Sequence, residues 1–140
     1  MSYVKIWIHA VWSTKNRRKL MIQEIRPIVF EHIHKNALKK DIFMDAVGGH
    51  IEHVHCLFRL QSHQTIKEVM QLLKGESSHW INQQKLIKSH FGWQDEYFAV
   101  SVSKSQVNRV RSYIMNQEAH HKKKTFQQEY EEFIKKYGFS

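Results

Sequence analysis

The alternation of apolar and polar positions predicts four strands. Residues 4–12 read VKIWIHAVW and are rich in apolar and aromatic β-formers, which is typical of a buried strand. Residues 42–47 and 51–60 are two more apolar segments, and the Gly48-Gly49 pair between them predicts a hairpin. Residues 97–103 alternate like a fourth strand.

Segments with helical spacing of apolar residues lie between these strands and after the last one. Ile25, Val29 and Ile33 recur at intervals of four residues, which indicates an amphipathic helix. Thr65, followed by Glu68, has the spacing of a capping box at the start of another. The predicted helices are, in chain order, residues 22–39, one that begins near residue 65, about 105–121, and a short one of about 125–138.

The order β-α-β-β-α-β-α-α predicts one α+β domain over residues 1–140. It fits a ferredoxin-like or RRM-like split β-α-β plan, with a four-stranded antiparallel sheet. We expect the two crossover helices on one face of that sheet. The tyrosine-bearing helix near the C-terminus follows the fourth strand, and it could cover part of the free face.

Composition narrows the class of protein. The only cysteine, Cys56, excludes a disulfide framework and favours a reducing, cytoplasmic location. The N-terminus does not resemble a signal peptide, and no apolar run approaches the roughly 18 residues of a membrane helix. The net charge of +9, from 22 basic and 13 acidic residues, favours a polyanionic partner such as nucleic acid. A merely soluble basic protein is the alternative.

The basic residues gather in two segments. Each could contact a DNA backbone or could simply be solvated. The candidate DNA-binding residues are Lys15, Arg17, Arg18 and Lys19 in the first segment, and Lys122, Lys123 and Lys124 in the second.

His53 and His55 form the sharpest local feature. Strand side chains alternate, so both should point to the open sheet face, while Val54, Cys56 and Phe58 point to the core. Two imidazoles on one face can share a metal ion, and Mg²⁺ or Mn²⁺ can be held if oxygen ligands complete the shell. Among eleven histidines, a chance pair is the alternative.

Tyr113 and Gln117 form a second feature. Residues four apart share one face of a helix, so a phenol and an amide oxygen could approach one site together. Ordinary surface packing of the tyrosine and solvation of the glutamine are the alternatives.

These segments resemble a known family. IEHVHCLF is similar to the H-hydrophobic-H strand of the HUH nucleases, and RSYIMNQ is similar to the tyrosine helix of their single-tyrosine transposases. Those enzymes mobilise small bacterial insertion sequences and include relatives associated with REP repeats. The flanking segments IWIHAVWSTKNRRKL, LLKGESSHW and FGWQDEYFAVSVSKSQ agree as well, so the resemblance covers nearly the whole chain.

The resemblance implies roles for the candidate residues. His53, His55 and Gln117 would hold Mg²⁺ or Mn²⁺, and Tyr113 would be the nucleophile. Relatives often have aspartate where this chain has Glu52. Since glutamate keeps the carboxylate, we expect this difference to alter at most the groups that surround the metal ligands and not the ligands themselves.

The resemblance also implies an activity and partners. The protein would cleave and rejoin single-stranded DNA at hairpin-bearing ends through a 5′-phosphotyrosine link. It would act as a homodimer and without ATP, which agrees with the lack of a Walker-type motif.

Two other functions stay open. One is a domesticated or inactive relative that binds DNA hairpins without mobilising an element. The other is an RNA-binding domain, because RNA-recognition modules share this sheet plan. Those modules expose aromatic side chains on the central strands, where this chain has histidines.

Overall fold

The computed structural model describes residues 2–138, so Met1 and the last two residues of the predicted domain lie outside the described residues. The strands are β1 (Ile6–Ser13), β2 (Phe43–Gly49), β3 (His53–Leu60) and β4 (Phe98–Val102). The helices are α1 (Arg26–Lys39), α2 (Ile66–Gln83), α3 (Val107–Met115), α4 (Gln117–His120) and α5 (Phe126–Lys136), with short 3₁₀ turns at Lys15–Arg17 and Lys104–Gln106. The predicted order of elements is confirmed within these residues.

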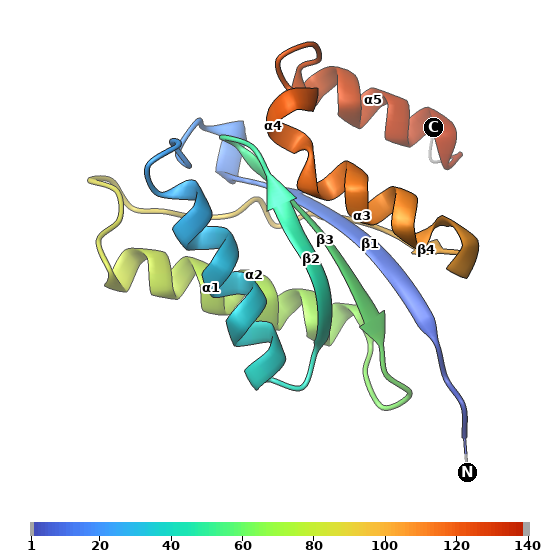
Figure 1. The fold of residues 1–140 in the computed structure, drawn as a ribbon. Helices are drawn as coiled ribbons and strands as arrows, with labels where there is room; N and C mark the ends of the chain where they lie inside the picture. The colour runs from blue at the N-terminus through green and yellow to red at the C-terminus, as the bar shows by residue number, and fades with distance from the viewer. Residues whose placement is uncertain (1, 139–140) are drawn as a thin grey trace.

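The four strands form one antiparallel sheet in the order β2-β3-β1-β4. β1 lies between β3 and β4, and β2 and β3 form the predicted hairpin (Figure 1). In the β1–β3 ladder, Val11 lies opposite His55 and Ser13 lies opposite His53. The histidine pair therefore lies at the start of β3, one of the two central strands, beside the end of β1.

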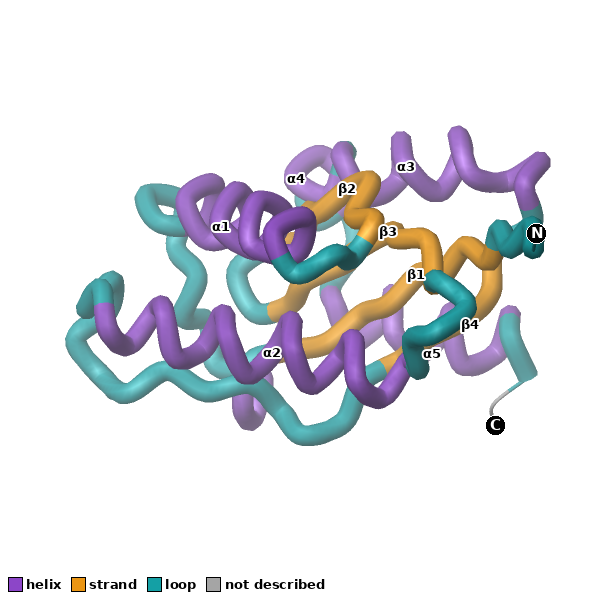
Figure 2. The backbone as a smooth tube through the Cα atoms, turned by 90° about the horizontal axis from the view of Figure 1, so that it is seen from below, coloured by secondary structure: helices purple, strands orange, loops and turns teal. Residues whose placement is uncertain are grey.

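Helices cover both faces of this sheet. Figures 1 and 2 show α1 and α2 on one side and α3, α4 and α5 on the other. The expectation that the helix after the fourth strand covers part of the free face is confirmed, and α4 and α5 extend that cover. The face that carries the histidines is consequently enclosed.

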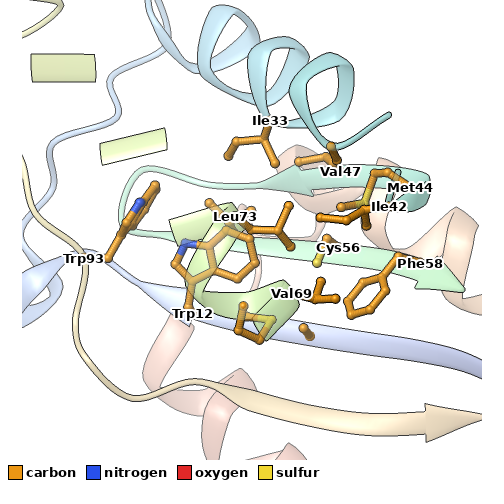
Figure 3. Packing of buried hydrophobic residues seen from close by; sticks show 14 of the residues in the cluster. Trp12, Ile33, Ile42, Met44, Val47, Cys56, Phe58, Val69, Leu73 and Trp93 are labelled. Carbon is orange, nitrogen blue, oxygen red and sulfur yellow. The ribbon is translucent and has the colours of Figure 1, made fainter. Parts of the chain in front are cut away.

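The main hydrophobic core lies between the sheet and the α1–α2 pair. Val54, Cys56 and Phe58 of β3 point into it and are fully buried, as the alternation predicted. They pack with Trp12 of β1 and with side chains of both helices, including Ile33 (Figure 3). Burial of this size supplies most of the driving force for the fold.

The opposite face has a smaller apolar cluster under α3. It contains Ala46, Leu57, Val107 and Ile114. At Gly48 the backbones of β2 and α3 come so close that a Cβ atom would lie 2.3 Å from the carbonyl oxygen of Ile114. Only glycine allows this approach, so α3 is held directly against the sheet.

A bulge in β2 provides a second contact with α3. The pairing of β2 with β3 shifts register between Met44 and Ala46. Asp45, at this bulge, accepts two hydrogen bonds from Arg111 of α3, at 2.6 Å from Nε and 2.8 Å from Nη2. A bidentate pair fixes orientation as well as distance, and Arg111 stands two residues before Tyr113.

Candidate active site

His53 and His55 lie on one face of β3, as the alternation predicted, but that face is not open. Both side chains have no exposed surface. The ring of Phe126, the first residue of α5, stacks on His53 with 4.1 Å between centroids and an angle of 5°. The prediction of an open sheet face was wrong, because α4 and α5 fold back over the histidines.

The predicted tyrosine helix, residues 105–121, is not continuous. Asn116 has φ −108° and ψ 20°, and its N–H bonds to the carbonyl of Tyr113 instead of continuing the α-helical ladder. The break separates α3 from α4 and redirects the chain. Gln117 is buried just beyond it, with Oε1 3.0 Å from Nε2 of His53.

Tyr113 reaches the same cluster from the last turn of α3. Its ring centroid lies 5.6 Å from that of His55, nearly perpendicular to it. Its hydroxyl donates a hydrogen bond to Oε2 of Glu129, and Nε2 of His120 lies 3.3 Å away. The tyrosine and the histidine pair therefore meet within one chain.

Glu129 of α5 lies at the centre of the cluster and is 1% exposed. Its Oε1 lies 3.1 Å from Nε2 of His55 and 3.3 Å from Nε2 of His53. Burial by itself raises the pKa of this carboxyl, but hydrogen bonds with His121 and the two β3 histidines hold the pKa well below its usual range. Glu129 is therefore an anion inside the cluster.

The sequence contains one signal for Glu129, a residue that the predicted site did not include. Phe126 and Phe133 mark the inward side of α5, and residue 129 falls between them at helical spacing. An acidic residue at an apolar position of an amphipathic helix needs a partner in the protein interior.

The other ring nitrogens of the histidines have partners of their own. Oε1 of Glu52 lies 2.7 Å from Nδ1 of His53, and Nε2 of His9 lies 2.9 Å from Nδ1 of His55. Burial, followed by the nearby charge of His55, lowers the pKa of His9 to about 3, so His9 is a neutral acceptor. With both Nδ1 atoms donating, the Nε2 atoms present lone pairs to the cluster.

This set of donor atoms fits a cation. Two imidazole nitrogens meet Oε1 of Gln117 and Oε1 of Glu129, and all four are acceptors. His53, His55 and Glu129 can each offer one ligand atom, with these atoms within 4.8 Å of one another. When both rings are neutral and their Nδ1 atoms donate, these four acceptors repel one another, and a divalent ion would remove that repulsion.

In the protein alone, the surroundings of the two histidines act on their pKa values in opposite directions. Burial lowers the pKa of His53, but hydrogen bonds with Glu129 and Glu52 outweigh it and raise the pKa. At His55 burial dominates and lowers the pKa to about 4. The site thus keeps His55 neutral, whereas the carboxylates beside His53 favour its protonated form.

Tyr113 is protonated in this arrangement. Burial raises the pKa of its hydroxyl, and the hydrogen bond to Glu129 and the charge of that carboxylate raise it further. A buried phenol beside an anion is a weak nucleophile. Positive charge in the cluster would favour the phenolate form.

The predicted basic segments flank α5. Lys15, Arg17, Arg18 and Lys19 are all exposed. The guanidinium of Arg17 lies over the rings of Phe126 and Tyr130, at 5.1 and 5.0 Å from their centroids. In the second segment Lys122 and Lys123 are exposed, while Lys124 forms an ion pair with Glu132 at 2.6 Å.

A groove of about 890 Å³ lies beside Arg17. β1, residues 94–99 and α5 line it, and its aromatic side chains include Tyr97, Phe98 and Tyr130. A basic side chain next to aromatic rings is the combination that single-stranded nucleic acids favour.

Comparison with known proteins identifies the family. Residues 2–117 match a family described as IS200-like transposases. The chain belongs to this family. It is thus a transposase, and the matched range includes His53, His55, Tyr113 and Gln117 but ends before Glu129.

Two solved structures share the fold of this IS200-like transposase. A transposase candidate from Deinococcus radiodurans R1 is 23% identical, with a TM-score of 0.67, and the match covers 84% of this chain and 95% of that one. A REP-associated tyrosine transposase bound to a REP hairpin is 17% identical, with a TM-score of 0.63, and the match covers 86% and 72%. A search of curated proteins finds no match. No helix among residues 2–138 is long and apolar enough to cross a membrane.

Proposed function

We propose that this transposase cleaves and rejoins single-stranded DNA through a covalent link to Tyr113. One observation carries the proposal: the hydroxyl of Tyr113 and the Nε2 atoms of His53 and His55 meet around the same buried carboxylate. A nucleophile beside a site that fits a divalent ion is what phosphoryl transfer from DNA requires.

In this proposal, His53, His55 and Gln117 hold Mg²⁺ or Mn²⁺. A bound ion would polarise the scissile phosphate and stabilise the charge that develops on it. Glu52 and His9 fix the ring orientations of the two histidines through their Nδ1 atoms. Covering helices exclude water, which strengthens every electrostatic interaction in the site.

Tyr113 performs the attack. A hydrogen bond to Oε2 of Glu129 orients its hydroxyl, and the phenol proton would pass to solvent as the positive charge of a bound ion favours the phenolate. The phenolic oxygen then forms a bond to phosphorus as the bond from phosphorus to the 3′ oxygen breaks. The leaving oxygen takes a proton from solvent, and the 5′-phosphotyrosine conserves the phosphodiester for a later attack by a 3′-hydroxyl, so no ATP is needed.

We infer that the substrate is a single strand that carries hairpins. The groove beside Arg17 offers aromatic rings on which unpaired bases can stack, and the two basic segments offer contacts for the phosphates. The structural neighbour that is bound to a REP hairpin supports the same class of DNA.

Covalent capture on Tyr113 tests the proposal. Wild-type protein, Mn²⁺ or Mg²⁺ and a hairpin-bearing single strand should give an adduct that survives denaturation and maps to Tyr113. Tyr113→Phe should give none, since it keeps the ring and removes only the attacking oxygen. Loss of the bond to Glu129 should lower the free energy of unfolding by on the order of 1–3 kcal/mol, so folding is checked by circular dichroism.

Tyr3→Phe is the matched control, because Tyr3 is 90% exposed and far from the histidines in the sequence. It should form the adduct at the wild-type rate. An adduct that persists in Tyr113→Phe would overturn the assignment of the nucleophile. Hairpin binding by the wild type without any adduct would favour a relative that only binds DNA.

A further inference from the structure

The C-terminal helix brings a carboxylate to the candidate metal site from outside the part of the chain that matches the family. Glu129 lies twelve residues beyond Gln117, where the match ends. Its side chain is 1% exposed and contacts both histidines of β3. A carboxylate so deeply buried is destabilising unless charged or hydrogen-bonding partners compensate for its lost hydration.

The structure around α5 fixes the position of Glu129. Thr125 and Gln128 form a complete capping box at the first turn of this helix. The ring of Phe126 stacks on His53, and the ring of Phe133 packs edge-on against His55 at 5.8 Å. These contacts hold both ends of the helical segment against the histidines, so the carboxylate between them has little freedom to turn away.

We propose that Glu129 is a fourth protein ligand of the divalent ion, supplied by the C-terminal helix of the same chain. Its Oε1 lies on the side of the two Nε2 atoms, together with the amide oxygen of Gln117. Mg²⁺ and Mn²⁺ prefer oxygen ligands, and Glu129 raises the oxygen donors from one to two. It also brings a negative charge to a buried dication whose other three ligands are neutral.

The second oxygen of Glu129 links the ion to the nucleophile. Oε2 accepts hydrogen bonds from the hydroxyl of Tyr113 and from Nε2 of Gln117, the latter at 3.2 Å. One carboxylate therefore faces the ion with one oxygen and orients the tyrosine and the glutamine with the other. Its ligand role rests on the metal-dependent chemistry proposed above.

Mn²⁺ binding by the full chain in the absence of DNA tests this role. Titration calorimetry should show weaker Mn²⁺ binding for Glu129→Gln, by about tenfold or more, because partners outside the ligand shell already contribute on that scale. Glu131→Gln is the matched control, since Glu131 is on the same helix but is exposed. Its Mn²⁺ affinity should equal that of the wild type.

Unchanged or tighter Mn²⁺ binding by folded Glu129→Gln would overturn the proposal and make the carboxylate a competitor for the site. If that variant does not fold, nuclear magnetic resonance of the wild type replaces it. Mn²⁺ should broaden the side-chain signals of Glu129 far more than those of Glu131, and equal broadening would contradict a ligand role. If Glu129→Gln weakens Mn²⁺ binding but the wild type forms no DNA adduct, the ligand role stands and the proposed function is overturned. If the wild type forms the adduct but Glu129→Gln binds Mn²⁺ as tightly as the wild type, the proposed function stands and the ligand role is overturned.

Discussion

The two histidines of β3 are oriented by different kinds of neighbour. A carboxylate, Glu52, lies beside the outer nitrogen of His53, whereas a neutral imidazole, His9, lies beside that of His55. Burial raises the pKa of Glu52, but the hydrogen bond with His53 outweighs it and lowers the pKa. A charged acceptor increases the basicity of the ring that it contacts, so His53 should be the stronger ligand of the pair.

Removal of this acceptor should weaken the metal site without direct contact to the ion. Glu52→Ala should reduce Mn²⁺ affinity by about 10- to 100-fold, because His53 loses its fixed tautomer and part of its basicity. Glu52→Asp keeps the charge and should lose less. Calorimetry on both variants checks the expectation, and equal affinities of wild type and Glu52→Ala would refute it.

At the level of elements, the contact of α3 with β2 sets the position of the tyrosine. Gly48 allows the two backbones to meet at Ile114, the residue after Tyr113, and the hydrogen bonds that Arg111 donates to Asp45 form a second contact of the helix with β2. Because protein interiors are densely packed, a shift at this contact moves the nucleophile as well.

Gly48→Ala should therefore affect both stability and reaction. The added methyl group meets the backbone of α3, and overpacking of this kind lowers the free energy of unfolding by about 1–3 kcal/mol. Adduct formation should slow as Tyr113 is displaced. Gly75→Ala is the control, because Gly75 is exposed on α2 and nothing lies within 4 Å of a Cβ atom there. This substitution should stabilise the helix by up to about 1 kcal/mol, since alanine is a better helix former than glycine. Urea unfolding measures the free energy of unfolding, and denaturing gels measure the rate of adduct formation.

At the scale of the whole molecule, the sheet separates two functions. One face carries the main hydrophobic core with α1 and α2, and the other carries the candidate site beneath α3, α4 and α5 (Figure 1). The family resemblance implies a homodimer, in which the tyrosine helix of one subunit could serve the histidines of the same subunit or of the other, and within one chain Tyr113 lies beside His55.

A mixing experiment distinguishes the two arrangements. Tyr113→Phe and His53→Ala each lack one part of the site, and their mixture should form no adduct if each site uses its own tyrosine and histidines. A mixture that recovers a substantial part of wild-type adduct formation would show that two subunits share the site. Gel filtration of the same samples checks whether the variants associate.

The sequence by itself determined the local features of this protein. Alternation along β3 placed His53 and His55 on one face and Val54, Cys56 and Phe58 on the other, since the period of two is a property of the strand alone. Helical spacing located α1, α2 and α5 for a similar reason. The order of these elements was sufficient to predict the antiparallel sheet plan.

Tertiary structure alone decided what surrounds the histidines. His9 and Glu129 reach His55 across 46 and 74 residues of sequence, and no periodicity specifies such contacts. The break at Asn116 also lies outside a simple helical pattern, although it allows Gln117 to reach His53. Local patterns predict which way a side chain points. Its partners depend on how distant elements pack, because the surfaces that bury it come from segments far away in the sequence.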